Sequence, residues 1–337
     1  MSDAFVSLEN VTLSYGQTVA VPNLNLDIRE GELIALLGPS GCGKTTSMRA
    51  IAGLLTPSGG RILIDGADVT RTPANKRGIG LVFQSYALFP HLSAFENVAF
   101  GLRLKRLPEV EIRAKTEAGM ATVGLTEFEA RKPSEMSGGQ QQRLALARSL
   151  VMEPKVLLLD EPLSNLDARL RLEMRNELRR MQKDTGITMI FVTHDQAEAL
   201  ALADRIVLMK DGVIEQLGTA SELYSEPNTA FTADFMGFEN IFRAEGGELV
   251  SDQGRVPLGF DAPSPLLAWR TSGVTVGEGR YSGCVLSSSF AGEHREYVLD
   301  CALGQIKADA AIGTPEVGIG ETIAFDLPQA TARPLPA

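Results

Sequence analysis

The N-terminal segment alternates between apolar and polar residues, whereas later segments contain short, almost wholly apolar runs. Alternation at residues 5–15 and 24–28 is typical of strands with one buried face, and the glycine turn between them predicts a small antiparallel sheet. The apolar runs at residues 33–37, 156–159 and 187–193 are typical of strands buried on both faces of a parallel sheet. Together these patterns predict an α/β fold.

Helical periodicity fills the spaces between these strands. Ser93, with Glu96 three residues later, resembles a capping box and predicts a helix start. A charged helix is expected over residues 108–123, and residues 166–181 carry an apolar stripe with a period near 3.6. We interpret the arginines and glutamates between these apolar positions as solvated i,i+4 partners. A further helical stretch is expected over residues 219–236.

The pattern changes again near the C-terminus. Short alternating runs separated by glycine turns occupy residues 280–285, 296–301 and 322–327. Such runs predict a small β-barrel or sandwich. We therefore expect a first domain at residues 1–237, containing a helical subdomain at about 88–153, and an all-β domain at residues 238–337.

Composition narrows the possible classes of protein. A length of 337 residues is compatible with about two domains, and a formal net charge of −10 argues against a general nucleic-acid binder. We expect no membrane span, because no stretch approaches 18 uncharged apolar residues, and no export signal. The three cysteines, an odd and sparse set, indicate a reducing compartment.

A glycine-rich loop after the first buried run carries the strongest chemical signal. Residues 38–45 fit the pattern G-x-x-x-x-G-K-[ST] between a predicted strand and a predicted helix. Its backbone N–H groups would surround phosphates, Lys44 would add a charge, and the Thr45 hydroxyl would face Mg²⁺. Cys42 is either a reactive thiol or a small loop residue. The expected nucleotide contacts here are Gly38, Ser40, Gly41, Cys42, Gly43, Lys44, Thr45 and Thr46.

A second anion site is expected at the start of another helix. Ser137, Gly138, Gly139 and Gln140 precede an apolar periodic segment, so N–H groups would again face an anion. One nucleotide does not need two such helix ends. We therefore expect two chains to hold each nucleotide from opposite sides.

Acidic and imidazole side chains follow two of the buried strands. Asp160 and Glu161 come directly after one strand, where ligands of open α/β sheets bind. Asp160 is placed to hold Mg²⁺ and Glu161 to activate a water molecule, although an N-cap is an alternative for the pair. His194 closes another strand, and we interpret it as a γ-phosphate sensor in preference to a structural histidine.

At this point the chain resembles the nucleotide-binding subunits of ATP-binding-cassette transporters over roughly residues 5–237, most specifically at Ser137-Gly138-Gly139-Gln140. The resemblance implies a homodimeric ATPase that uses ATP and Mg²⁺. It implies that Tyr15 stacks on adenine, where residue type alone left a hairpin-packing tyrosine equally open. It further implies that Gln84 contacts Mg²⁺ and water, and that Asp167 communicates across the dimer. Glu161, His194 and Gln84 would then be the catalytic residues, with Thr45, Gln84 and Asp160 at the metal.

The loop at residues 84–92 is similar to that of importers whose ATPase carries an accessory, oligonucleotide-fold-like domain. The resemblance implies that Tyr86, Leu88 and Phe89 are exposed and meet a membrane permease, which works with an extracytoplasmic binding protein. Internal packing of these three side chains is the alternative. The ATPase would lie peripherally on the cytoplasmic face of the inner membrane.

The resemblance at this loop implies a slight preference for polyamine as the imported solute, and ferric iron, aminoethylphosphonate or sugar remain open. The accessory domain could serve dimerisation, regulation or ligand sensing. Two functions of other classes are weighed against this one. The first is a soluble cassette protein that acts on nucleic acid or ribosomes, and the second is a glycine-loop kinase, in which residues 137–140 would have no role.

Overall fold

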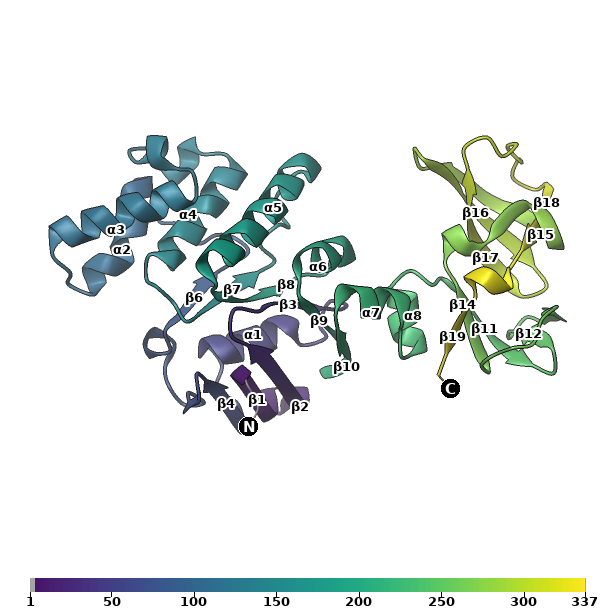
Figure 1. Ribbon diagram of the computed structural model, residues 1–337, viewed down its shortest axis with the longest axis horizontal. Coiled ribbons are helices and arrows are strands. Elements are labelled where there is room, and N and C mark those ends of the chain that lie inside the picture. The colour runs from purple at the N-terminus through teal and green to yellow at the C-terminus, as the bar shows by residue number, and fades with distance from the viewer. Residues whose placement is uncertain (1–3, 337) are drawn as a thin grey trace. The chain divides into compact units, whose positions relative to one another are not determined.

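The computed structural model describes residues 4–336, and the chain divides into two compact units, Met1–Ser221 and Glu222–Ala337. Among the residues described, no helix is long and apolar enough to cross a membrane. Figure 1 shows helices and a mixed sheet in the first unit, and antiparallel strands in the second. The predicted α/β domain followed by an all-β domain is confirmed.

A six-stranded sheet forms the centre of the first unit. Its strands, in spatial order, are β10 (Val213–Gly218), β9 (Arg205–Lys210), β3 (Leu33–Leu37), β8 (Thr188–Val192), β7 (Val156–Asp160) and β6 (Ile79–Val82). All neighbours are parallel except β10 and β9. Every residue of β3 and β8 is buried, which explains why these strands are apolar throughout rather than alternating.

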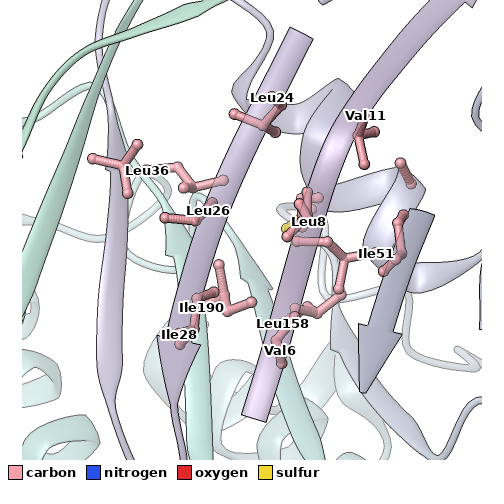
Figure 2. Packing of buried hydrophobic residues seen from close by; sticks show 14 of the residues in the cluster. Val6, Leu8, Val11, Leu24, Leu26, Ile28, Leu36, Ile51, Leu158 and Ile190 are labelled. Carbon is pink, nitrogen blue, oxygen red and sulfur yellow. The ribbon is translucent and has the colours of Figure 1, made fainter. Parts of the chain in front are cut away.

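An antiparallel sheet packs beside this core. It contains β2 (Thr18–Arg29), β1 (Ala4–Tyr15), β4 (Gly59–Ile64) and β5 (Ala67–Asp68). Helix α1 (Lys44–Ala52) contacts β1 and β2 of this sheet as well as β7 and β8 of the core. Figure 2 shows alternate residues of β1 and β2, such as Val6, Leu8 and Leu26, pointing into one cluster with Ile51 of α1. The alternation therefore marks the buried face.

The remaining helices of the first unit are α2 (Ala94–Leu104), α3 (Glu109–Thr122), α4 (Gly138–Leu150), α5 (Ala168–Thr185) and α6 (Gln196–Leu202). Helices α2, α3 and α4 pack against one another. Ser93 caps α2 as predicted, since its side chain accepts a hydrogen bond from the Glu96 N–H. The Glu96 carboxylate pairs with Arg103, two turns later on the same face of α2.

The second unit holds two antiparallel sheets around one core. The first sheet contains β13 (Arg255–Pro257), β12 (Glu248–Val250), β11 (Asn240–Glu245), β14 (Leu266–Trp269) and β19 (Arg333–Leu335). The second contains β17 (Gly304–Ala311), β16 (His294–Cys301), β15 (Thr275–Phe290) and β18 (Thr322–Asp326). Trp269, Tyr297 and Phe325 are buried in the core between them.

Two sequence-based expectations about the junction need correction. The helical stretch expected over residues 219–236 is two short helices, α7 (Ala220–Ser225) and α8 (Ala230–Phe235), because Pro227 interrupts them. The division falls at residues 221 and 222, ahead of the expected boundary at 237 and 238. The physical reason is Arg270, whose guanidinium lies 3.6 Å from the ring centroid of Tyr224 and 4.1 Å from that of Phe238.

Candidate functional site

The glycine-rich loop joins β3 to α1 at the carboxyl edge of the core sheet. Gly38 has a φ of +144°, and a Cβ there would collide with the carbonyl oxygen of Met209. Gly43, at the N-cap of α1, has a φ of +101°, and its Cβ would lie 2.8 Å from Val21 Cγ2. The loop thus takes its shape from backbone that only glycine tolerates, and it lies tightly against β9 and β2.

Charge and hydroxyl groups are concentrated in this loop. The ammonium of Lys44, which is buried, donates to the carbonyl oxygens of Gly38 (2.7 Å) and Pro39 (2.8 Å). Ser40 and Gly41 are exposed at the tip, while Thr45 and Thr46 are half-buried in the first turn of α1. The first N–H groups of α1 have no carbonyl four residues earlier within the helix, so this end can receive an anion.

Cys42 is buried, with only 3% of its surface exposed, and its Sγ lies 3.7 Å from the Lys44 ammonium. A thiol in that position is closed off from bulky reagents. This burial favours the interpretation of Cys42 as a small packing residue of the loop.

Asp160, the last residue of β7, lies opposite the loop. The Thr45 hydroxyl donates to Asp160 Oδ1 at 3.4 Å. Burial raises the pKa of the Asp160 carboxyl, and the hydrogen bond from Thr45 partly offsets this effect. A hydroxyl and a carboxylate side by side are oxygen donors of the kind that Mg²⁺ prefers. Among residues 4–336 no group of three or more His, Cys, Asp or Glu side chains is arranged to hold a metal alone. Bound phosphate oxygens or water would have to complete the coordination of Mg²⁺.

Glu161 is the point where three segments meet. Its Oε2 accepts a hydrogen bond from Gln84 Nε2 at 3.1 Å, and its Oε1 lies 3.5 Å from His194 Nδ1. The backbone at Glu161 has a φ of +44°, an uncommon conformation for a residue other than glycine. The structure therefore brings together Glu161 and His194, which sequence analysis placed at the ends of two separate strands, and Gln84, which the family resemblance added.

Two polar residues that sequence analysis did not select hold Gln84. Its side-chain amide lies 3.3 Å from Ser164 Oγ, and its carbonyl oxygen accepts from Asn165 Nδ2 at 2.8 Å. Both residues lie between a buried strand and a capped helix. Polar residues directly after a buried strand lie at the edge of the sheet where ligands bind, so this position could have identified Ser164 and Asn165 as site residues.

Other predicted site residues lie elsewhere on the first unit. Tyr15 is about half exposed at the end of β1. Ser137 and Gly138 are exposed at the start of α4, where Ser137 and Gln140 form the capping box (Ser137 N–H to Gln140 Oε1, 2.9 Å). Asp167 caps α5, accepting from the Leu170 N–H at 2.9 Å. The second anion site expected from the sequence thus lies at the start of α4, a different helix from the one that follows the glycine-rich loop (Figure 1).

The loop after Gln84 differs from the expectation of three exposed apolar side chains. Tyr86 is buried, with 5% of its surface exposed, while Leu88 and Phe89 are half-buried. Tyr86 and Ala87 both have positive φ values, which turn the tyrosine inward. Arg148 of α4 donates to the carbonyl oxygens of these two residues at 2.9 and 2.8 Å. The expectation that Tyr86 is exposed was wrong, because this turn directs its ring into the protein.

Comparison with known proteins identifies the family to which this chain belongs. Residues 21–164 match the family described as ABC transporter. The Fe(3+) ions import ATP-binding protein FbpC of Brucella abortus (strain 2308) is 50% identical over 314 residues, which cover 89% of each chain. This chain belongs to the ATP-binding proteins of ABC transporters.

Two further relatives extend the comparison for this ABC protein. The spermidine/putrescine import ATP-binding protein PotA of Marinobacter nauticus is 52% identical over 242 residues, covering 72% of this chain and 65% of PotA. A dimeric post-hydrolysis structure of the ATP-binding cassette MJ0796, bound to ADP and Pi, is 35% identical with a TM-score of 0.57. It covers 64% of this chain and 98% of that one. This ABC protein is an ATPase that binds ATP.

Proposed function

We propose that this chain is the ATP-hydrolysing subunit of a membrane importer and that Glu161 activates the water that attacks ATP. The contact of Glu161 with both Gln84 and His194 carries this proposal. A carboxylate held at the end of a strand by two polar partners is suited to orient a water molecule and to accept its proton.

The glycine-rich loop would hold the phosphates of ATP. Its backbone N–H groups and the Lys44 ammonium would stabilise negative charge that develops on the γ-phosphoryl group. Thr45, Asp160 and Gln84 would hold Mg²⁺, which neutralises charge on the phosphates when it is bound. Tyr15 would stack on the adenine base, and His194 would contact the γ-phosphate.

The exposed position of Ser137 and Gly138 supports a complete nucleotide site that is formed by two chains. Gly138 and Gly139 begin α4 with N–H groups that an intrahelical carbonyl does not reach. We infer that two copies pack so that Ser137, Gly138 and Gln140 of one meet the nucleotide on the glycine-rich loop of the other. Asp167, at the cap of α5, would then lie near the seam between the copies.

Substitution Glu161→Gln tests the proposed mechanism. Glutamine preserves the size of the side chain and one acceptor oxygen for Gln84, but its amide is not basic and cannot accept the proton, so we expect turnover to fall by about 10²-fold or more. ATP binding should persist, and an ATP-dependent dimer should accumulate in size-exclusion chromatography. Glu173→Gln is the matched control, because Glu173 lies away from Glu161 on α5 and pairs with Arg169 one turn earlier on the same helix. Hydrolysis by Glu161→Gln at the wild-type rate would remove Glu161 as the base.

The imported solute is proposed from relatives and not from the site. The Fe(3+) importer relative matches along 89% of this chain, including most of the β domain, whereas the polyamine relative matches along 72%. We therefore favour ferric iron over the polyamine that the loop after Gln84 suggested. Leu88 and Phe89 would meet the permease, and the chain would lie on the cytoplasmic face of the inner membrane.

Isolation from detergent-solubilised membranes tests the partner and the solute together. We expect a polytopic permease to copurify with the chain, along with an extracytoplasmic binding protein whose ligand identifies the solute. Iron bound to that protein would support import of ferric iron, and a bound polyamine would instead support import of polyamine. Recovery of ribosomal or DNA-bound proteins in place of a permease would favour the soluble cassette alternative.

A further inference from the structure

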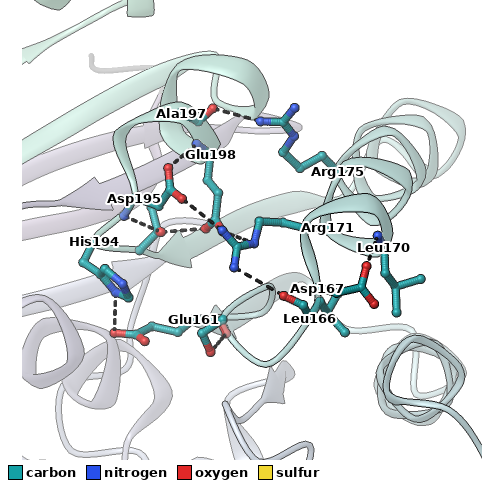
Figure 3. A network of polar contacts seen from close by, with 12 residues as sticks. Glu161, Leu166, Asp167, Leu170, Arg171, Arg175, His194, Asp195, Ala197 and Glu198 are labelled. Atoms are coloured by element: carbon teal, nitrogen blue, oxygen red, sulfur yellow. Dashed lines mark hydrogen bonds and ion pairs between the residues drawn. The ribbon is translucent and has the colours of Figure 1, made fainter. Parts of the chain in front are cut away.

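Arg171, on the first turns of α5, touches two loops that carry site residues (Figure 3). Its Nη2 donates to the Leu166 carbonyl oxygen at 3.3 Å, in the loop that runs from Glu161 to Asp167. Its Nη1 donates to Asp195 Oδ2 at 3.5 Å, in the residue that follows His194. One guanidinium thus joins the segment after β7 to the segment after β8.

The segment after β8 is itself a closed hydrogen-bonded unit. The Asp195 N–H donates to Thr193 Oγ1 at 3.0 Å, and the Thr193 hydroxyl donates to Glu198 Oε2 at 2.6 Å. The Glu198 N–H in turn donates a hydrogen bond to Asp195 Oδ1 at 3.1 Å, which closes the ring of contacts. His194 lies between Thr193 and Asp195, so its two neighbours are fixed by these bonds. A group that moves this unit also moves the imidazole.

An ion pair with the buried carboxylate of Glu198 holds the Arg171 side chain in place. Glu198 has only 4% of its surface exposed, and its Oε1 lies 3.7 Å from Arg171 Nε. Burial raises the pKa of Glu198, and the hydrogen bond from Thr193 and the nearby charge of Arg171 act in the opposite direction. Charges in a partly dry environment attract more strongly than in water, so the contact resists displacement.

We propose that Arg171 is a positioning residue for ATP hydrolysis. It holds the loop that runs from Glu161 to Asp167 in a fixed position relative to His194. The 3.5 Å contact between His194 Nδ1 and Glu161 Oε1 crosses between the two segments that Arg171 joins. Arg171 acts through His194 and not on the nucleotide. The proposal rests on the proposed ATPase mechanism and adds a residue that controls its geometry.

A double-mutant cycle with His194 tests this role in the full-length chain. Arg171→Gln shortens the side chain and removes its charge, so we expect kcat to fall about tenfold or more, because small misplacement of catalytic groups is costly. The KM for MgATP should change less than about twofold, since binding groups are untouched. In a His194→Ala background, Arg171→Gln should lower the single-turnover rate by less than about twofold, because the residue it positions is already absent.

Matched variants separate positioning from general stability. Arg169→Gln removes the same charge from the same helix, but the Arg169 side chain is 91% exposed and, among the described residues, it pairs with Glu173 alone. It should leave kcat unchanged. Arg171→Lys, which keeps the charge and one donor, should recover part of kcat. If Arg171→Gln proves poorly folded, the same cycle is measured with Arg171→Lys.

Two results would overturn the proposal. One is an equal loss of rate from the Arg171 substitution with and without His194, and the other is a wild-type kcat in Arg171→Gln. Failure of the ATPase mechanism itself is distinguishable, because it appears as undiminished hydrolysis in Glu161→Gln. That variant does not alter Arg171.

Discussion

Asn97 of α2 fixes the loop that follows Gln84, and its replacement by aspartate changes hydrogen bonding with almost no change in side-chain shape. Asn97 is fully buried. Its Nδ2 donates to the carbonyl oxygens of Phe89 (3.1 Å), Leu92 (3.2 Å) and Ser93 (2.9 Å), and its Oδ1 accepts from the Phe89 N–H at 2.8 Å. Aspartate preserves the acceptor and removes both donor hydrogens.

The expected cost follows from these contacts. Two lost donor hydrogens are worth about 1 kcal/mol each, and partly buried carbonyl oxygens left facing a second acceptor add about 1–3 kcal/mol. We therefore expect Asn97→Asp to destabilise the first unit by about 3–5 kcal/mol at neutral pH. The introduced carboxyl would have a raised pKa in the folded state. Its penalty should therefore shrink as the pH falls and it takes up a proton.

Hydrogen exchange and chemical denaturation check this expectation separately. Peptides spanning residues 85–93 should exchange faster in Asn97→Asp, and the unfolding midpoint from far-UV circular dichroism should fall. The only tryptophan, Trp269, is buried in the second unit, so the midpoint from its fluorescence should not move. Asn176→Asp, at an exposed position of α5, is the control and should stay within about 0.5 kcal/mol. Wild-type stability and exchange in Asn97→Asp would refute the reasoning.

Two further predictions concern other parts of the chain. Burial raises the pKa of Asp204, but hydrogen bonds from Arg179 (2.6 Å) and from a backbone N–H outweigh burial and leave the pKa lowered. Asp204→Asn should therefore cost about 0.5–1 kcal/mol above pH 5, discounted for partial exposure, and the difference in denaturation midpoints should shrink progressively as the pH falls from about 4 through the lowered pKa of Asp204. A constant difference down to pH 3 would contradict this assignment. Arg270→Ala should destabilise the second unit by about 2–3 kcal/mol, because it removes the stacking on Tyr224 and Phe238 and two donors to carbonyl oxygens. Tryptophan fluorescence during denaturation would record that loss, and an unshifted midpoint would show that the stacking contributes nothing.

The elements that sequence analysis predicted well depend on neighbours in the chain. The buried run at residues 33–37 and the glycine loop after it are defined by residues within a few positions, so β3 and the start of α1 were found. The cap of Ser93 on α2 is likewise a contact over three residues. Such signals depend only on residues close together in the chain, so they can be recognised without knowing how the rest of the chain packs.

Polar side chains on α5 show where local reasoning fails. Arg169 does pair with Glu173 at i,i+4 as expected, 3.1 Å apart. Glu177 instead pairs with Arg143 of α4 at 2.9 Å, and its side chain is only 11% exposed. Helical spacing alone does not distinguish a solvated partner from one on another helix. The partner depends on how the two helices pack.

The sequence by itself determined the chemistry available to this protein: a phosphate-binding loop, an acidic pair after one strand and a histidine after another. Each of these depends on backbone conformation and residue type over a short stretch of chain. Only the tertiary structure decided which of them meet. Gln84, Glu161 and His194 come together because β6, β7 and β8 are parallel neighbours in the six-stranded sheet and end at the same edge. The burial of Tyr86 likewise depends on a turn held by Arg148 from a distant helix, and that contact is recorded in no local pattern.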